Sequence, residues 1–198
     1  KADVIFSNNM ITNNSGTGGG AAFSLNQAYV LIDKNNISNN IANGSEEWAA
    51  GITLLGIDWS ERFGSIDLTN NTISGNQGRG VIVHQTYRLT ISRNIIDNNT
   101  GDRGSGVYIG HNSRNTTINN NMISSNSEYG IAVRYGYTVT IANNIIVSNI
   151  KEGLRLGTTE TPTWLNGGSG IVEHNTILKN GVTREIFLNT GNWILTNN

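Results

Sequence analysis

The sequence predicts an all-β solenoid of short parallel strands, and three observations support this prediction. Two columns of Asn recur along the chain with a basic period of 23 residues. Apolar and polar residues alternate within each repeat, which is typical of strands with one buried face. No helical periodicity interrupts this pattern in the 198 residues. Self-similarity at such a period is the signature of coils that bury a core only by stacking on one another.

The composition agrees with this fold class and excludes several others. The chain has 24 Gly, 32 Asn, one Pro and no Cys, and its formal net charge is -1. The lack of Cys excludes a disulfide framework and a thiolate zinc site, and the lack of a basic run argues against a nucleic-acid partner. No apolar stretch approaches the roughly 18 residues of a membrane span. Ile, Val and Tyr are too frequent for a disordered chain, so we expect a single domain over residues 1–198.

The first Asn column supplies one anchor residue for each repeat. The anchors are separated by 26, 36, 23, 27, 23, 31 and 23 residues, and they are Asn9, Asn35, Asn71, Asn94, Asn121, Asn144, Asn175 and Asn198. Ile stands two positions after each of the first seven, as Ile11, Ile37, Ile73, Ile96, Ile123, Ile146 and Ile177. Asn returns five positions after the same anchors, as Asn14, Asn40, Asn76, Asn99, Asn126, Asn149 and Asn180. We therefore expect about eight coils of about 23 residues, with insertions in the longer ones.

Each coil is expected to hold three short strands. The first precedes the anchor, as in residues 89–91, and the second carries the Ile column. The third follows a glycine, as in residues 80–83 and 106–109. Stacked coils of this kind predict three parallel sheets. We expect each anchor Asn to occupy a left-handed bend between the first two strands and to form a ladder with the Asn of the next coil.

This repeat resembles the right-handed parallel β-helix of the pectate-lyase-like superfamily. The matching residues are the segment 89–99, Leu-Thr-Ile-Ser-Arg-Asn-Ile-Ile-Asp-Asn-Asn, and the later Gly-Val-Tyr-Ile at 106–109. The resemblance covers almost the whole chain and implies a right-handed β-helix. It constrains function less, because such repeats occur in polysaccharide lyases, uronate epimerases, glycoside hydrolases, phage tailspikes and non-enzymatic surface proteins. Neither the Asp-Pro-His motif of uronate epimerases nor the paired Asp cluster of polygalacturonases is present.

The two ends of the chain show no amphipathic helix or polar cap. The sequence begins inside a coil at Val4 and stops on the anchor Asn198. Because an uncapped solenoid presents open strand edges and core to water, we expect a fragment of a longer solenoid or multidomain protein, capped by flanking domains or partner subunits. Residues 1–198 do not contain the pattern of a signal peptide. The expectation of a secreted or cell-surface protein follows from the carbohydrate-related resemblance.

Three insertions enlarge turns of the regular coil. Residues 41–50 and 55–64 flank one post-glycine strand, and residues 157–169 follow a later one. Insertions on a repeat scaffold are where function usually lies. Three of the four Trp residues, Trp48, Trp59 and Trp164, stand in these insertions and are candidate substrate-binding residues.

The outward positions of the post-glycine strands gather the other candidate residues. One outward column is Thr53, Ile82, Tyr108, Ala132 and Arg155, the next is His84, Gly110, Arg134 and Gly157, and His111, Tyr135 and Tyr137 follow in the turn. Aromatic rings offer sugars an apolar face, and Arg offers a carboxylate two parallel hydrogen bonds. The pattern predicts a groove for an acidic, uronate-containing polysaccharide, a few sugar units long. The competing interpretation is that exposed strands commonly carry Tyr, Arg and His with no site assembled.

If this face is catalytic, β-elimination at a uronic acid or C5 epimerisation fits it best. Such an enzyme must neutralise the carboxylate and place a base near C5 and an acid near the leaving oxygen. His84 or His111 could be the base and Tyr108 the acid. Arg134 or Arg155 could neutralise the carboxylate, with Tyr135 and Tyr137 as binding residues. The alternative function is a non-enzymatic solenoid segment of the structural, adhesin or tailspike type.

No cofactor is required by this chemistry, although calcium is conceivable. Asp102, Glu128 and Glu152 fall at nearly matching places before successive post-glycine strands, so adjacent coils could share a calcium ion. The neighbouring cations Arg79, Arg103 and Lys151 favour exposed ion pairs instead. His174, on another face, is expected to be an exposed strand residue.

Overall fold

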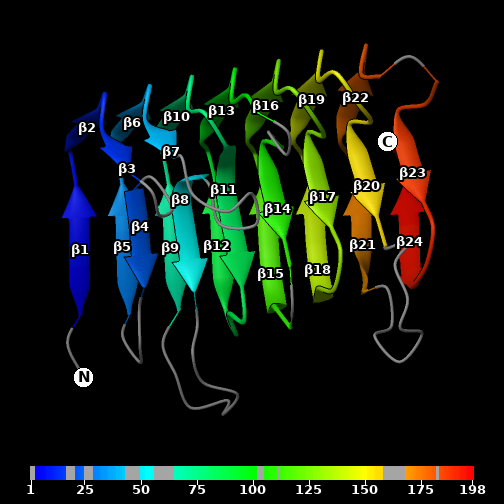
Figure 1. The fold of residues 1–198 in the computed structure, drawn as a ribbon. Coiled ribbons are helices and arrows are strands. Elements are labelled where there is room, and N and C mark those ends of the chain that lie inside the picture. The colour runs from blue at the N-terminus through cyan, green and yellow to red at the C-terminus, as the bar shows by residue number, and fades with distance from the viewer. Residues whose placement is uncertain are drawn as a thin grey trace.

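In the computed structural model, every regular element of the described residues is a β-strand, and the strands stack into one solenoid (Figure 1). The structure describes residues 3–16, 21–24, 29–42, 50–55, 65–101, 105–110, 112–157, 168–181 and 183–198. Within these ranges no helix is long and apolar enough to cross a membrane. The chain is therefore all-β, as the sequence predicts.

Three long parallel sheets make up the solenoid. Sheet 1 contains β1 (Val4–Ser7), β5 (Val30–Asp33), β9 (Ile66–Thr69), β12 (Leu89–Ser92), β15 (Arg114–Asn119), β18 (Tyr137–Ala142), β21 (Ser169–Glu173) and β24 (Asn192–Thr196). Sheet 2 contains β2 (Met10–Thr12), β6 (Asn36–Ser38), β10 (Thr72–Ser74), β13 (Ile95–Asp97), β16 (Met122–Ser124), β19 (Ile145–Val147) and β22 (Thr176–Leu178). Sheet 3 contains β4 (Ala21–Ser24), β8 (Ala50–Leu55), β11 (Arg79–His84), β14 (Val107–Ile109), β17 (Ile131–Val133), β20 (Leu154–Leu156) and β23 (Ile186–Leu188). The short strands β3 (Ser15–Gly16) and β7 (Ile41–Ala42) pair separately.

One strand from each long sheet, taken in chain order, makes one coil. The described strands give seven complete coils and the first strand, β24, of another, because sheet 1 has 8 strands and sheets 2 and 3 have 7 each. The coil count is thus slightly lower than the expected eight. The fold class and the three parallel sheets are confirmed.

The core is a set of apolar columns that run along the solenoid axis. The Ile that follows each anchor pairs in register with the same Ile of the next coil, as Ile73 does with Ile96 and Ile96 with Ile123. The side chains of Ile73, Ile96 and Ile123 are fully buried. Burying each such side chain contributes about 1.5–3 kcal/mol of hydrophobic free energy, so the columns hold successive coils together.

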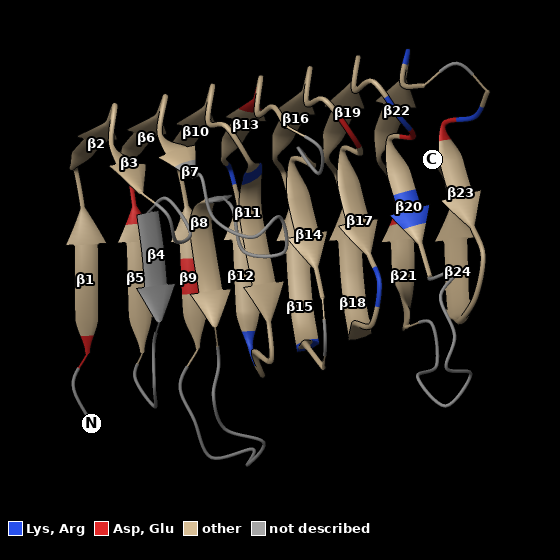
Figure 2. Ribbon diagram, in the orientation of Figure 1, with Lys and Arg blue, Asp and Glu red and all other residues tan. Residues whose placement is uncertain are grey.

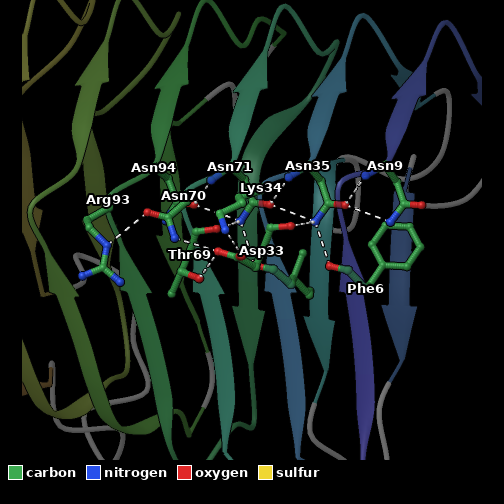
Figure 3. A network of polar contacts seen from close by, with 11 residues as sticks. Phe6, Asn9, Asp33, Lys34, Asn35, Thr69, Asn70, Asn71, Arg93 and Asn94 are labelled. Atoms are coloured by element: carbon green, nitrogen blue, oxygen red, sulfur yellow. Dashed lines mark hydrogen bonds and ion pairs between the residues drawn. The ribbon is translucent and has the colours of Figure 1, made fainter.

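The two Asn ladders are present as predicted, and Figure 3 shows part of the first. From Asn9 to Asn198, the Nδ2 of each anchor donates to the Oδ1 of the next anchor at 2.9–3.0 Å. The backbone N–H of each anchor donates to the same oxygen, as from Asn71 to Asn94 at 2.9 Å. The second ladder repeats this pattern from Asn14 to Asn180. The buried amides are therefore satisfied by one another.

The left-handed bend lies one residue earlier than expected. The anchors have ordinary backbone angles, and positive φ values belong to the residues before them, which are Asn8, Lys34, Asn70, Arg93, Asn120, Asn143, His174 and Asn197. The side chains at this left-handed position, such as Lys34 and Arg93, point into solvent, so the position tolerates many residue types. The bend turns the side chain of the following anchor Asn into the core. His174 is accordingly exposed but lies in a turn instead of a strand.

The glycine at or just before the start of a sheet 3 strand, as in β11, β14 and β17, is required by the close packing of consecutive coils. A Cβ at Gly80, Gly106 or Gly130 would lie 2.4–2.6 Å from an Ile Cγ2. The same Cβ would lie 2.9–3.0 Å from the Nδ2 of the second-ladder Asn in the following coil. The ladder Asn of the following coil thus fills the space that a side chain would need.

Candidate functional site

The candidate site is the outer face of sheet 3. Strand register places Thr53, Ile82, Tyr108, Ala132, Arg155 and Phe187 in one row across six coils. Residues that alternate with this row, such as Val81 and Val107, lie in the core with no exposed surface, as predicted. The predicted direction of the side chains is therefore correct.

The outward row is more covered than the alternation pattern suggests. Ile82 is 0% exposed, Tyr108 is 9% exposed and His84 is 6% exposed. The guanidinium carbon of Arg79 lies 4.2 Å from the centroid of the Tyr108 ring, and Tyr129 packs against the cluster that contains Tyr108. Part of the predicted exposed face is thus a second, smaller buried layer, because side chains from the residues before the glycines fold over it.

Three of the four candidate catalytic residues lie together on this face. The ring centroids of His84 and Tyr108 are 5.8 Å apart. Arg134 Nη1 donates to the Tyr108 hydroxyl at 3.4 Å. Gly110 leaves the room that the imidazole fills, since a Cβ there would lie 2.3 Å from His84 Cε1. The fourth candidate, His111, lies outside the described residues.

A second group of side chains, here called the cationic-aromatic cluster, lies further along the same face. Its members are Tyr129, Lys151, Arg155, Arg184 and Phe187. Arg155 Nη1 donates to the Tyr129 hydroxyl at 2.6 Å, and the Arg155 guanidinium lies 5.2 Å from the Phe187 ring. Arg184 lies 4.1 Å from the Phe187 ring, and Lys151 lies 5.4 Å from the Tyr129 ring. Figure 2 shows the Arg segment of β20 in blue, next to β23.

Two carboxylates hold cations of this cluster in place. Glu128 pairs with Lys151, and Glu152 pairs with Arg184 at 3.0 Å. The hydrogen bond to Glu128 raises the pKa of Lys151 above its ordinary 10.5, so the ammonium stays charged at neutral pH. The cluster therefore presents three cations against two carboxylates on a half-buried aromatic surface.

Two of the three acidic residues considered for calcium are used in these ion pairs. Glu128 and Glu152 each contact a cation, which agrees with the ion-pair interpretation, while Asp102 and Arg103 lie outside the described residues. Over the described ranges, no three His, Cys, Asp or Glu side chains gather in a way that could hold a metal ion. Calcium binding stays an untested prediction.

The remaining candidates fall in different places. Tyr135 is 4% exposed, and the Arg134 guanidinium lies 5.9 Å from its ring. Tyr137 begins β18 in sheet 1, where its ring lies 5.8 Å from the Arg114 guanidinium, so it belongs to another sheet. Trp48, Trp59 and Trp164 lie outside the described residues, as do most of the three insertions. The walls of a groove are therefore still a prediction.

Comparison with known proteins identifies the architecture as a right-handed β-helix. A family model described as "Right handed beta helix region" matches residues 1–167. The solved structure of the periplasmic alginate epimerase AlgG is 16% identical, with a TM-score of 0.67 over 98% of this chain and 43% of that chain. The A-module of the Azotobacter vinelandii mannuronan C-5 epimerase AlgE4 is also 16% identical, with a TM-score of 0.51 over 96% of this chain and 58% of that chain. No curated protein sequence matches.

These similarities concern the fold. The chain spans less than half the length of the AlgG structure, and 16% identity carries no residue roles from one chain to another. The chemistry of the outer face of sheet 3 must therefore be argued from its own side chains.

Proposed function

Because this chain belongs to the right-handed β-helix family, we propose that the outer face of sheet 3 binds an acidic, uronate-containing polysaccharide. The observation that carries this proposal is that two half-buried Arg side chains of this face each lie beside two aromatic side chains. Arg134 lies beside Tyr108 and Tyr135, and Arg155 lies beside Tyr129 and Phe187. The similar fold of two enzymes named for alginate and mannuronan supports the choice of a polyuronate. A secreted or cell-surface location, proposed here too, suits such a ligand and agrees with the periplasmic location in the AlgG name.

The geometry of the row suits a linear polymer. Neighbouring strands lie about 4.8 Å apart, so the four steps from β11 to β23 span about 19 Å, the length of a few sugar units. Arg134 and Arg155 stand one coil apart and could each meet a carboxylate of the polymer. Guanidinium groups form bidentate hydrogen bonds with carboxylates, and the aromatic rings offer apolar faces to sugars.

Binding is better supported than catalysis on this face. A general base must come within hydrogen-bond reach of the proton that it removes, and His84 is 6% exposed. The grouping of His84, Tyr108 and Arg134 is the observation that keeps β-elimination or C5 epimerisation as a second candidate. A structural, adhesin or tailspike segment is the non-enzymatic alternative, and it predicts no polysaccharide binding.

Substitution of the two Arg residues tests the binding proposal. Arg134→Ala and Arg155→Ala each remove a charge-assisted hydrogen bond worth about 1.5–3 kcal/mol, so affinity for alginate or pectate should fall about ten-fold or more. Affinity electrophoresis in gels that contain either polymer measures this loss. Arg93→Asn is the matched control, because it removes one positive charge from the turn between β12 and β13, away from sheet 3. Asn tolerates the φ of 55° at this position.

Stability and product analysis complete this experiment. The thermal midpoints of the variants should stay close to that of the wild type. A further variant, Tyr108→Phe, keeps the ring and removes the hydroxyl that Arg134 contacts. Unchanged retention of both Arg variants would overturn the assignment of this face. Incubation with a panel of polyuronates, followed by the absorbance of unsaturated uronates, separates β-elimination from binding alone. A trimer in solution would favour the tailspike alternative.

A further inference from the structure

The turn that leads from sheet 3 into sheet 1 carries aromatic and basic side chains in consecutive coils. Strand pairing places Arg114 opposite Tyr137 of the next coil. The same register, followed one coil earlier, places Tyr87 opposite Arg114. These three residues and Arg88, which follows Tyr87 in the chain, are called the corner row. The row runs along the solenoid axis at the corner between the two sheets.

The side chains of the corner row are kept out of the core by a bend in the backbone. Arg114 is exposed, although the residue two positions later in β15, Thr116, is fully buried. The residues that follow Arg114 and Tyr137 are Asn115 and Thr138, and their φ values are 50° and 57°. A left-handed residue breaks the two-residue alternation of a strand. The Arg side chains of the row are therefore exposed, and its Tyr rings are half-buried.

The two Arg side chains of the corner row contact aromatic rings instead of carboxylates. The Arg88 guanidinium lies 5.6 Å from the centroid of the Tyr87 ring, and the Arg114 guanidinium lies 5.8 Å from that of Tyr137. Among the described residues, neither Arg forms an ion pair with Asp or Glu. Figure 2 shows blue at the starts of β12 and β15 and no red there. The corner therefore presents two positive charges on a chain whose net charge is -1.

A guanidinium with a ring on either side suits an acidic sugar polymer. Neighbouring strands lie about 4.8 Å apart, so Tyr87 and Tyr137 stand about 10 Å apart along the axis, about the length of two sugar units. Each ring offers a sugar an apolar face, and Arg114 between them offers a carboxylate two parallel hydrogen bonds. A nucleic acid is the less suitable polyanion, because the isoelectric point of about 6.3 lacks the basic excess of its usual partners.

We propose that the corner row is a second binding site for an acidic polysaccharide, separate from the outer face of sheet 3. Arg114 binds one carboxylate of the polymer, Arg88 binds another, and the two Tyr rings contact the sugars. The choice of a uronate polymer rests on the proposed function, whereas the site itself rests on the side chains of the corner row. Because the corner row and the outer face of sheet 3 both run along the axis, one chain holds two stretches of polymer.

Titration calorimetry with oligouronates of about four sugar units, about 20 Å at the strand spacing, tests the proposal by counting sites. The wild type should bind two oligomers per chain. The corner variant, Arg88→Ala with Arg114→Ala, should bind one, and the face variant, Arg134→Ala with Arg155→Ala, should also bind one. Arg93→Asn removes a positive charge from another turn and should keep both sites. A neutral glucan oligomer of the same length should bind to none of these proteins.

Substitution of a ring separates stacking from charge. Tyr137→Phe keeps the aromatic face and should keep the second site, whereas Tyr137→Ser should weaken it about ten-fold. Because the Tyr137 ring is half-buried, thermal midpoints must accompany this comparison. The two substituted Arg side chains of the corner variant are exposed, so its thermal midpoint should match that of the wild type.

A long polymer gives a second measurement. A wild-type chain with two sites should join separate alginate or pectate chains and raise their light scattering, whereas the corner variant and the face variant should each bind without joining them. A folded corner variant that still binds two oligomers would overturn the second site. A wild type with one site, lost in the face variant alone, would overturn it too and would leave the proposed function intact. Loss of one site in the corner variant, with both kept in the face variant, would support the second site and contradict the proposed function of sheet 3.

Discussion

Each buried Asn of the two ladders has its side-chain amide satisfied by hydrogen bonds within the stack of coils. Asn94, for example, donates from Nδ2 to the backbone carbonyl of Leu68 and to Asn121 Oδ1, while its own Oδ1 accepts from Asn71. An unpaired buried polar group costs about 1–3 kcal/mol, whereas a paired one costs little. The Asn excess of the sequence is thus stabilising only because each residue is stacked on an identical one.

Removing one ladder residue should therefore be costly. Asn121→Ala removes the acceptor of the Asn94 backbone N–H and one of the acceptors of Asn94 Nδ2, and both donors are buried. We expect the free energy of unfolding to fall by about 3–5 kcal/mol, from several unsatisfied groups and a small cavity. Urea denaturation measures this loss. Asn120→Gly is the neighbouring control, with an expected change within about 0.5 kcal/mol because its side chain is exposed and its φ is 55°.

The neighbours Asn120 and Asn121 show which positions of the turn can be predicted from the sequence. Buried columns of identical residues are visible in the sequence, because burial leaves no freedom to vary. The left-handed position is occupied by such different residues as Lys34, Arg93 and His174, because their side chains point into solvent. No residue preference marks that position, so the bend was wrongly assigned to the more regular neighbour.

At the scale of the elements, polar side chains cross-link neighbouring strands at their ends. Asp33 ends β5 and accepts hydrogen bonds from Asn70 Nδ2 at 2.6 Å and Thr69 Oγ1 at 2.8 Å, both from the next coil (Figure 3). Lys34 Nζ lies 3.6 Å from the same carboxylate. These contacts couple the turn after β5 to the turn after β9.

This network predicts a specific response to acid. The hydrogen bond from Asn70 is the main cause that lowers the pKa of Asp33 below its ordinary 3.8. A carboxyl whose pKa is lower in the folded state contributes stability above its unfolded pKa, and loses it as the pH falls through the folded pKa. Below about pH 4, the thermal midpoint of the wild type should therefore fall more steeply than that of Asp33→Asn. Parallel curves for the two proteins would show that the network does not stabilise the fold.

The elements of the candidate site were only partly predictable. Alternation along β14 and β17 correctly indicates which side chains leave the core, since it follows from the geometry of any strand. It cannot indicate what covers them, and Arg79 and Tyr129 were therefore missed as part of the site. A signal was present, because both residues stand immediately before a glycine of the same column. Side chains at the position before the glycine pack over the outward row of sheet 3, as Arg79 and Tyr129 do over Tyr108.

For the whole molecule, stability is a sum of contacts between neighbouring coils. A central coil packs against two neighbours, whereas a coil at the end of the described stack packs against one. The Ile column shows the difference within one residue type. Ile96 is fully buried between Ile73 and Ile123, while Ile11 is only partly buried and pairs with Ile37 alone among described strands.

The same truncation should consequently cost different amounts at different places along the axis. Ile96→Ala should lower the free energy of unfolding by about 3–4 kcal/mol, because the cavity is closed on both sides, and Ile11→Ala by about 1–2 kcal/mol. Because repeat proteins need not unfold in a single step, amide hydrogen exchange should accompany the denaturation curves. Ile96→Ala should reduce protection in β10 and β16 together, and Ile11→Ala only near β6. Equal losses in the two variants would mean that the end coil is held as firmly as the centre, so that the one-sided packing of Ile11 is not what limits its contribution.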